Sequence, residues 1–313
     1  MTETITGPTD NTATISAPTK RQNKTIALTF DDAPRSAVGY FDGPTRAQKL
    51  LTALQQAQVN QVAFFAVSKR IDDEGHQRLM TYAKAGHLIA NHTHSHPDFN
   101  QTSLEQYQND FNQADKRLSQ YPNFRRWFRY PFLREGDTLE KRDGMRKALA
   151  QTGYVNAYIT VNNYDWYLES LFQQAIKAQQ KIDFDALRDL YVNTMMQAVR
   201  YYDQMSLQHT ERSVAHVLLL HEMDISALFI DDLVSQLRKE GWTIISPIQA
   251  YQDPIAQQVT NNLFKFNPGR IGEIAKDNGQ RKGLWHTSLE EDYLKQRFER
   301  EVIITDAPRP TAN

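Results

Sequence analysis

The sequence predicts an α/β fold, in the form of a distorted (β/α) barrel of about seven parallel strands. From Lys24 onward, short apolar runs alternate with amphipathic stretches of helical period, as in strands joined by crossover helices. Several helical stretches end at a glycine, namely Gly86, Gly153 and Gly241. No strand is followed by a glycine-rich phosphate loop, which favours a barrel over a dinucleotide-binding fold.

The individual elements follow from the same pattern. The apolar runs predict strands at 24–30, 61–67, 87–91, 124–131, 154–161, 215–221 and 242–246. The amphipathic stretches between them predict helices near 45–58, 72–85, 103–120, 138–152 and 226–240. The sequence contains no internal repeat.

Two segments depart from this alternation. The segment 166–213 contains two successive helical stretches, about 166–181 and 184–208, where one crossover helix would be enough. A helical extension at about 261–301 follows the last strand and carries Trp285, Tyr293 and Phe298. We favour packing of both segments on the barrel as scaffold, because aromatic residues at helical spacing usually belong to a core. The alternative is that the insertion forms a lid over the strand ends.

These features suggest three parts. Residues 1–22 are polar and rich in threonine, which predicts a disordered leader. Residues 23–252 form the barrel domain, with the helical insertion at about 166–213. Residues 253–313 form a helical C-terminal extension and tail.

Composition restricts the classes of function. In 313 residues, 40% are apolar, including 15 Phe, 14 Tyr and 4 Trp, enough for a sizeable core. The net charge of -1 provides no field that would attract nucleic acid or anionic lipid. Because there is no cysteine, any metal must be bound by histidine and carboxylate.

The sequence contains no stretch of about 18 apolar residues, so we expect no integral membrane segment. Its first twenty residues lack the basic start and apolar run of a signal peptide. The compartment therefore stays open: extracytoplasmic, in the periplasm or secreted, if a signal was trimmed from the chain, and otherwise cytoplasmic. The oligomeric state is also open.

The most informative motif is His92-Thr93-His94-Ser95-His96, which directly follows the predicted strand 87–91. On one helical turn, side chains four residues apart share a face, so His92 and His96 are expected to converge on one cation. A carboxylate is available at Asp31-Asp32, after the strand 24–30. His94 lies on the other side of the turn and is taken as an ordinary histidine.

Three further positions also follow predicted strands: the Arg129–Phe132 segment, Asp165-Trp166 and His221-Glu222. In a barrel, the C-terminal ends of the strands share one rim, where such folds place their active sites. Each position alone has a simpler explanation, such as a helix cap, a solvated turn or a strand ended by proline. The coincidence of all five positions at strand ends indicates an active site.

Together the motifs resemble those of the polysaccharide deacetylase superfamily, carbohydrate esterase family four. That family carries, in order, Thr-Phe-Asp-Asp, His-Ser/Thr-x-x-His, Arg-x-Pro, Asp-Trp and Leu-x-His motifs. Here they are Thr29–Asp32, His92–His96, Arg129–Phe132, Asp165-Trp166 and Leu219–His221. The resemblance covers about residues 24–250 and leaves out the insertion and the C-terminal extension.

The resemblance implies a role for each motif. Asp32, His92 and His96 would bind one divalent metal, with zinc as first choice and cobalt or nickel as alternatives. Asp31 would be the general base and Arg129 its ion-pair partner. His221 would be the general acid, and Asp165 would hold its tautomer. The backbone N–H of Phe132 would stabilise the oxyanion in a substrate pocket that also includes Tyr130. Trp166 and Leu219 would enclose the acetyl methyl group.

The resemblance thus implies a metal-dependent hydrolase of N-acetyl groups, less readily of O-acetyl groups, on an amino-sugar glycan such as chitin oligosaccharide or peptidoglycan. The alternatives are an amidase acting on a small non-glycan amide and an inactive carbohydrate-binding homologue. Two departures from the family pattern bear on the substrate. Asn162 stands where an Asp is frequent, and Glu222 where an Asp is usual, and residues flanking these motifs are expected to touch the sugar.

Overall fold

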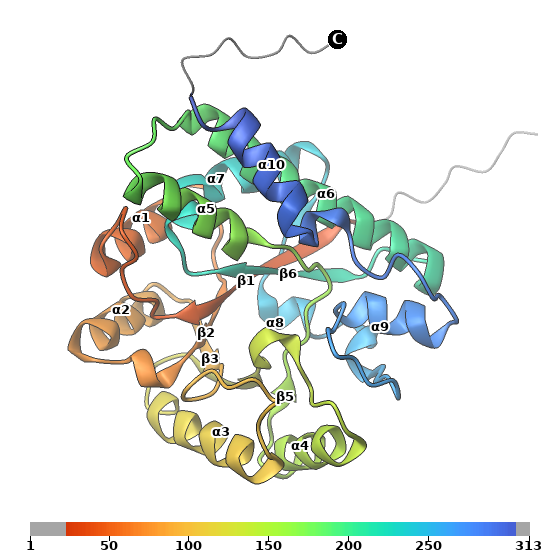
Figure 1. The fold of residues 1–313 in the computed structure, drawn as a ribbon. Helices are drawn as coiled ribbons and strands as arrows, with labels where there is room; N and C mark the ends of the chain where they lie inside the picture. Colours follow the sequence, from red (N-terminus) through yellow and green to blue (C-terminus); the bar gives the residue numbers. More distant parts are fainter. Residues whose placement is uncertain (1–22, 305–313) are drawn as a thin grey trace, which may run out of the picture.

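Parallel strands form one curled sheet in the computed structural model, which describes residues 23–304 (Figure 1). The predicted leader 1–22 lies outside the described residues. All seven predicted strands are present: β1 Thr25–Ala33, β2 Ala63–Ala66, β3 Leu88–Asn91, β4 Phe124–Phe128, β5 Val155–Asn156, β6 Ala215–His221 and β7 Thr243–Ile244.

The sheet curls because its two ends are joined by the segment that follows β5. The strand order is β5-β4-β3-β2-β1-β6, and β7 pairs with β1. Beyond β5, Val161 forms a parallel bridge with Leu218 of β6, and the Thr160 N–H donates to the carbonyl of Val217 at 3.0 Å. The fold is therefore a distorted (β/α) barrel, as the sequence predicts.

Helices surround this sheet (Figure 1). They are α1 Gly43–Gln56, α2 Asp73–Lys84, α3 Leu104–Leu118, α4 Leu139–Gln151, α5 Asp165–Lys177, α6 Phe184–Thr210, α7 Asp224–Lys239, α8 Pro247–Ala250, α9 Arg270–Asp277 and α10 Glu291–Glu301. Short 3-10 turns lie at Ser68–Arg70, Pro131–Leu133, Pro254–Gln257 and Thr287–Leu289. Among the described residues, no helix combines the length and the apolar character needed to cross a membrane.

The insertion and the C-terminal extension pack together on one side of the barrel. Helix α6 contacts α7 and α9, and α10 lies across α5 and α6 (Figure 1). The prediction of helix throughout 261–301 is wrong, because only α9, a 3-10 turn and α10 are helical there. Pro268 and the left-handed backbone of Gly269, with a φ of 87°, keep the chain out of helix before α9.

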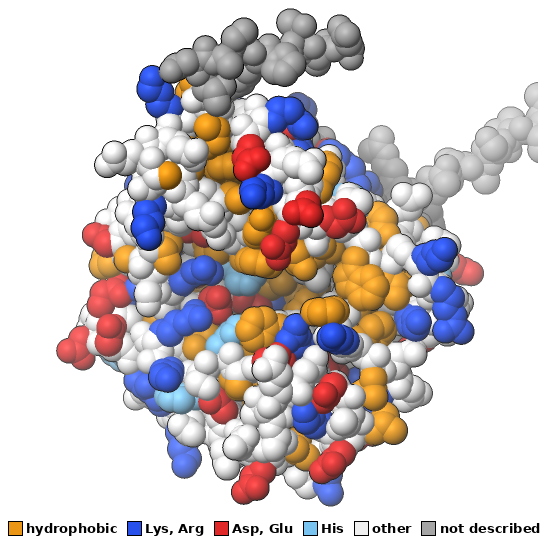
Figure 2. All heavy atoms as spheres, in the orientation of Figure 1, with side chains coloured by type: hydrophobic (Ala, Val, Ile, Leu, Met, Phe, Trp, Pro, Cys, Tyr) orange, Lys and Arg blue, Asp and Glu red, His pale blue; other side chains and the backbone are white. Residues whose placement is uncertain are grey.

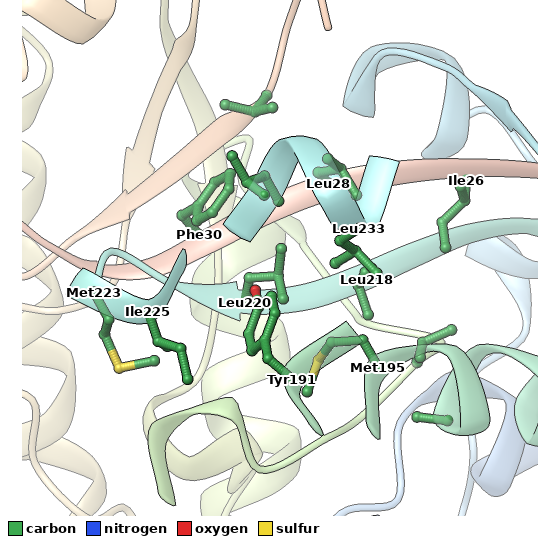
Figure 3. Close-up of a cluster of buried hydrophobic side chains, with 14 of the residues drawn as sticks. Ile26, Leu28, Phe30, Tyr191, Met195, Leu218, Leu220, Met223, Ile225 and Leu233 are labelled. Carbon is green, nitrogen blue, oxygen red and sulfur yellow. The ribbon is translucent and has the colours of Figure 1, made fainter. Parts of the chain in front are cut away.

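The largest core lies between the sheet and the helices α6 and α7 (Figure 3). Alternate residues of β1, namely Ile26, Leu28 and Phe30, point toward these helices and are fully buried. The residues between them, Ala27 and Thr29, face the barrel interior. Ala27 packs there against Val217 and Leu219 of β6. In β1 and β6 this alternation directs the next interior side chains, Asp31 and His221, toward the C-terminal mouth of the barrel.

Candidate active site

A cavity of about 390 Å³ opens at the C-terminal ends of the strands. Figure 2 shows histidine and acidic side chains at the floor of a hollow on this face, with hydrophobic side chains around it. Its walls come from seven separate parts of the chain. The lining residues are Asp31, Asp32, Arg35, His92, His96, Phe132, Leu133, Arg134, Asn162, Asn163, Tyr164, Trp166, Leu219, His221, Phe266, Asn267, Trp285 and Leu289.

The pairing of β1 with β6 brings Asp31 and His221 together. The two strands are in parallel register from Thr25, opposite Ala215, to Asp31, opposite His221. His221 is the last residue of β6 and Asp31 lies near the end of β1, and both side chains reach the same cavity. The expected base and the expected acid are therefore neighbours across one strand pair.

A backbone irregularity lets Asp31 and Asp32 share this cavity. In a regular strand, successive side chains point to opposite faces. Here the register between β1 and β2 shifts between Phe30 and Ala33, and Asp32 has a φ of 73°. Such a bulge redirects the extra side chain, and Asp tolerates the left-handed region better than most residues.

His92 and His96 converge as expected, but not on a helical turn. The segment after β3 is a loop in which Thr93 and His96 have φ values of 70° and 60°. The loop brings the two imidazole centroids to 4.9 Å. The prediction that a helical turn brings the two histidines together is therefore wrong. A tight loop with left-handed backbone at Thr93 and His96 brings them together instead.

Hydrogen bonds fix which ring atom of His92 faces the cavity. Its Nδ1 donates to the backbone carbonyl of Arg129 at 2.7 Å, which leaves Nε2 as the free ring nitrogen. Burial lowers the pKa of His92 to about 3 and that of His96 to about 4. Both imidazoles are therefore neutral at ordinary pH, as a metal ligand must be.

The three expected ligands fit a divalent cation. One potential ligand atom from each of Asp32, His92 and His96 lies within 4.8 Å of the others. The Oδ1 atom of Asp32 is buried and accepts no hydrogen bond, and Arg70 Nη1 and His96 Nε2 lie 3.3 Å and 3.4 Å from it. Burial alone would raise the pKa of Asp32, but His96 and Arg70 outweigh it, and the pKa lies below its ordinary value. An ionised carboxylate whose Oδ1 accepts no hydrogen bond, beside two neutral imidazoles, is a donor set for zinc, cobalt or nickel.

Asp31 is held by Arg129, as expected. The guanidinium Nη1 lies 2.9 Å and 3.1 Å from the two carboxylate oxygens, and both side chains are buried. Arg129 itself stacks 4.3 Å from the ring centroid of Phe65 and donates to the Tyr251 hydroxyl at 3.2 Å. Burial raises the pKa of Asp31 and Arg129 only partly opposes this, so the net shift is upward. The ion pair orients Asp31 more than it keeps it ionised.

His221 forms a close pair with Asp165. The imidazole Nδ1 donates to Asp165 Oδ1 at 2.7 Å, and the His221 backbone N–H donates to Oδ2 at 2.8 Å. Burial alone would lower the pKa of His221, but the carboxylate of Asp165 outweighs it and the pKa is raised. The Nε2 atom of a protonated His221 is left to donate into the cavity.

The turn after β4 lines the cavity with Phe132 but not with Tyr130. Phe132 adopts a left-handed φ of 56°, and its ring makes an edge contact with His96 at 4.7 Å. Tyr130 points away from the cavity and is buried with Phe99 and Tyr107, which are roughly parallel to it. Tyr130 is therefore not a pocket residue, because strand alternation turns it toward the aromatic cluster behind the sheet.

Trp166 and Leu219 both line the cavity, and Asn162 lies beside them. Glu222 does not, contrary to the expectation that it touches the substrate. It is fully buried, accepts a hydrogen bond from Tyr82 Oη at 2.7 Å and lies 3.2 Å from Arg78 Nη1. Its longer side chain reaches a buried arginine behind the cavity.

Sequence reasoning missed the part of the C-terminal extension that lines the cavity, which is Phe266, Asn267, Trp285 and Leu289. Arg35 and Arg134 were also missed. The one available signal was the Asn-Pro-Gly sequence after Phe266, which predicts a loop within a supposed helix.

Part of the chain is also similar in sequence to known proteins. Residues 19–157 match the family model described as polysaccharide deacetylase. This part of the chain is therefore similar to the polysaccharide deacetylases. Peptidoglycan-N-acetylmuramic acid deacetylase PdaA of Bacillus subtilis is 24% identical over 236 residues, which cover 72% of this chain and 70% of that protein.

Two solved structures of similar proteins are 20% identical to this chain. The peptidoglycan deacetylase PdaC from Bacillus subtilis has a TM-score of 0.46, with 74% of this chain and 91% of that chain covered. A family 4 carbohydrate esterase from Streptomyces lividans, in complex with acetate, has a TM-score of 0.47, with 73% and 96% covered. The motifs at Asp165 and His221 lie beyond the residues that match the family model.

Proposed function

We propose that this chain is a metal-dependent deacetylase that hydrolyses the N-acetyl group of an amino-sugar glycan. The observation that carries the proposal is the arrangement of the cavity. Asp31 and His221 stand opposite each other in the β1–β6 register, beside the ligand set of Asp32, His92 and His96. The substrate class is supported by the name of PdaA, a peptidoglycan-N-acetylmuramic acid deacetylase.

A bound divalent cation, zinc as first choice, lowers the pKa of water and polarises a carbonyl oxygen. The residues of the chain account for the proton transfers. Asp31, oriented by Arg129, accepts a proton from the attacking water as the new C–O bond forms at the acetyl carbon. A raised pKa suits this role, because a base is most effective when its pKa lies near the working pH.

His221 supplies the acid on the other side. As the C–N bond breaks, Nε2 donates its proton to the departing amine, so the products are acetate and a free amino sugar. Asp165 holds Nδ1–H and stabilises the charged ring. The Phe132 N–H is proposed to donate to the developing oxyanion, and Trp166 and Leu219 to enclose the acetyl methyl group.

Acetate release from N-acetylglucosamine oligomers and peptidoglycan fragments tests this proposal. The metal-loaded protein should release acetate, and Asp31→Asn should abolish most of that release. A matched O-acetylated glycan distinguishes ester from amide hydrolysis. Release from a small N-acetyl amide, with none from any glycan, would favour the small-molecule amidase instead.

A further inference from the structure

Five aromatic side chains are exposed among the described residues, and three of them lie at the cavity, whereas Tyr40 and Phe184 lie outside it. Phe132 and Phe266 are each 55% exposed and Trp285 is 43% exposed, and all three line it. Large apolar side chains exposed together at one concave site mark a ligand surface. Phe266 and Trp285 come from the C-terminal extension, beyond the residues that match the family model.

A stack of planar groups joins Phe266 to the candidate metal site. The Arg134 guanidinium lies 5.2 Å from the ring centroid of Phe266 and 5.4 Å from that of Phe132. Phe132 in turn contacts His96 at 4.7 Å. Arg134 is also paired with Asp98, so its charge is compensated within the chain. The stack therefore offers an apolar surface rather than a free cation.

The loop that carries Phe266 is anchored firmly to the barrel. The Arg270 N–H donates to the carbonyl of Ile159 at 2.7 Å. A Cβ at Gly269 would lie 2.7 Å from Ile159 Cδ1 and 3.1 Å from the Ile159 carbonyl oxygen, so only glycine permits this approach. Asn267 donates to buried Glu273 at 2.7 Å and accepts from the Gly269 N–H at 2.7 Å. Phe266 is thus an exposed ring on a fixed support.

Trp285 has a similar support. The preceding Leu284 is buried in the main core, and the hydroxyl of Tyr201 on α6 donates to the carbonyl of Gly283 at 2.5 Å. The following 3-10 turn contains the fully buried Ser288. An exposed indole between buried neighbours contributes contact area at low cost in conformational entropy.

From this arrangement we propose that Phe266 and Trp285 form the wall that selects the substrate, by stacking against the apolar face of the sugar ring that bears the N-acetyl group. This proposal rests on the proposed function and specifies the substrate contact. The two rings bind the sugar and take no part in the proton transfers at Asp31 and His221.

Calorimetric titration with N-acetylglucosamine oligomers tests the wall without turnover. In a metal-loaded Asp31→Asn background, adding Phe266→Ala or Trp285→Ala should each raise the Kd about tenfold, the effect of one lost stacking contact. Phe266→Tyr and Trp285→Phe, which keep a planar ring, should stay within about twofold. Leu263→Ala is the matched control, because Leu263 is 41% exposed in the same segment and lies outside the cavity.

Turnover in the otherwise native enzyme separates binding from chemistry. The two alanine variants should raise the KM for the oligomers while hydrolysis of 4-nitrophenyl acetate, which has no sugar, is unchanged. An unchanged Kd and KM would overturn the wall and leave the deacetylase proposal intact. An equal loss on glycan and ester would also overturn it, because the rings would then act on the chemical centre. If the metal-loaded wild type neither bound nor hydrolysed any amino sugar, both proposals would fall together.

Discussion

The most discriminating substitution is Asp165→Asn, because Asp165 is fully buried and accepts three hydrogen bonds. Its Oδ1 accepts from His221 Nδ1 at 2.7 Å and from the Trp166 N–H at 2.8 Å, and its Oδ2 accepts from the His221 N–H at 2.8 Å. An amide has only one oxygen, so Asn must turn its NH2 group toward one of these donors.

The magnitude follows from the lost charge. A hydrogen bond to a charged group contributes about 1.5–3 kcal/mol, which corresponds to about one to two units in the pKa of His221. Because Asp165 raises that pKa, the substitution lowers it, and His221 loses its proton at a lower pH. We expect the alkaline limb of the pH–kcat profile to move down by about one to two pH units, and kcat to fall by about 10²–10⁴-fold.

The assay is acetate release by metal-loaded protein at a series of pH values. The matched control is Asp203→Asn, which alters a second buried pair, His216 Nε2 to Asp203 Oδ1 at 3.3 Å, outside the cavity. The control should cost stability without moving the alkaline limb. Superimposable profiles for Asp165→Asn and wild type, or an equal shift in the control, would refute His221 as the acid.

Three further predictions concern the base, the metal and acid stability. Asp31→Asn should lower kcat by about 10²–10⁴-fold while the metal content measured by atomic spectroscopy is unchanged, and loss of metal would contradict its role as base. His96→Ala should weaken metal affinity by more than about tenfold in a chelator competition, and unaltered affinity would remove it from the ligand set. Burial lowers the pKa of His87 from 6.5 to about 4, so the unfolded chain takes up its proton first as pH falls. The contribution of neutral His87 to the free energy of unfolding is complete above the pKa of His87 in the unfolded chain. About 2 kcal/mol of it should be lost by about pH 5. His87→Gln should remove that loss in urea unfolding of the chelated protein, and an unchanged pH dependence would contradict it.

The sequence was sufficient to predict the barrel and the strand ends at which the candidate site lies. The apolar run of β1 and its partner β6 identified parallel strands, and parallel strands place Asp31 and His221 at one rim. Local backbone geometry was not predictable in the same way. Asp31 and Asp32 face one cavity because Asp32 has a left-handed φ. The hydrophobic periodicity of the sequence cannot predict one irregular residue of this kind.

The contribution of the C-terminal extension was not predictable because it is tertiary. Phe266 and Arg134 are separated by 132 positions in the numbering, and their contact exists only because the loop after η3, Pro254–Gln257, is anchored to Ile159. The prediction that Tyr130 belongs to the substrate pocket was wrong for a simpler reason. Its motif placed it near the site, but the side-chain alternation of the chain after β4 turned it into the aromatic cluster.

The central claim is that Asp32, His92 and His96 bind a metal required for deacetylation. The most direct test is acetate release from N-acetylglucosamine oligomers after chelation, and again after zinc, cobalt or nickel is added back. We predict that chelation abolishes release and that at least one of these metals restores it in wild type but not in His92→Ala. Acetate release that persists in the metal-free protein, or that returns equally in His92→Ala, would contradict the account.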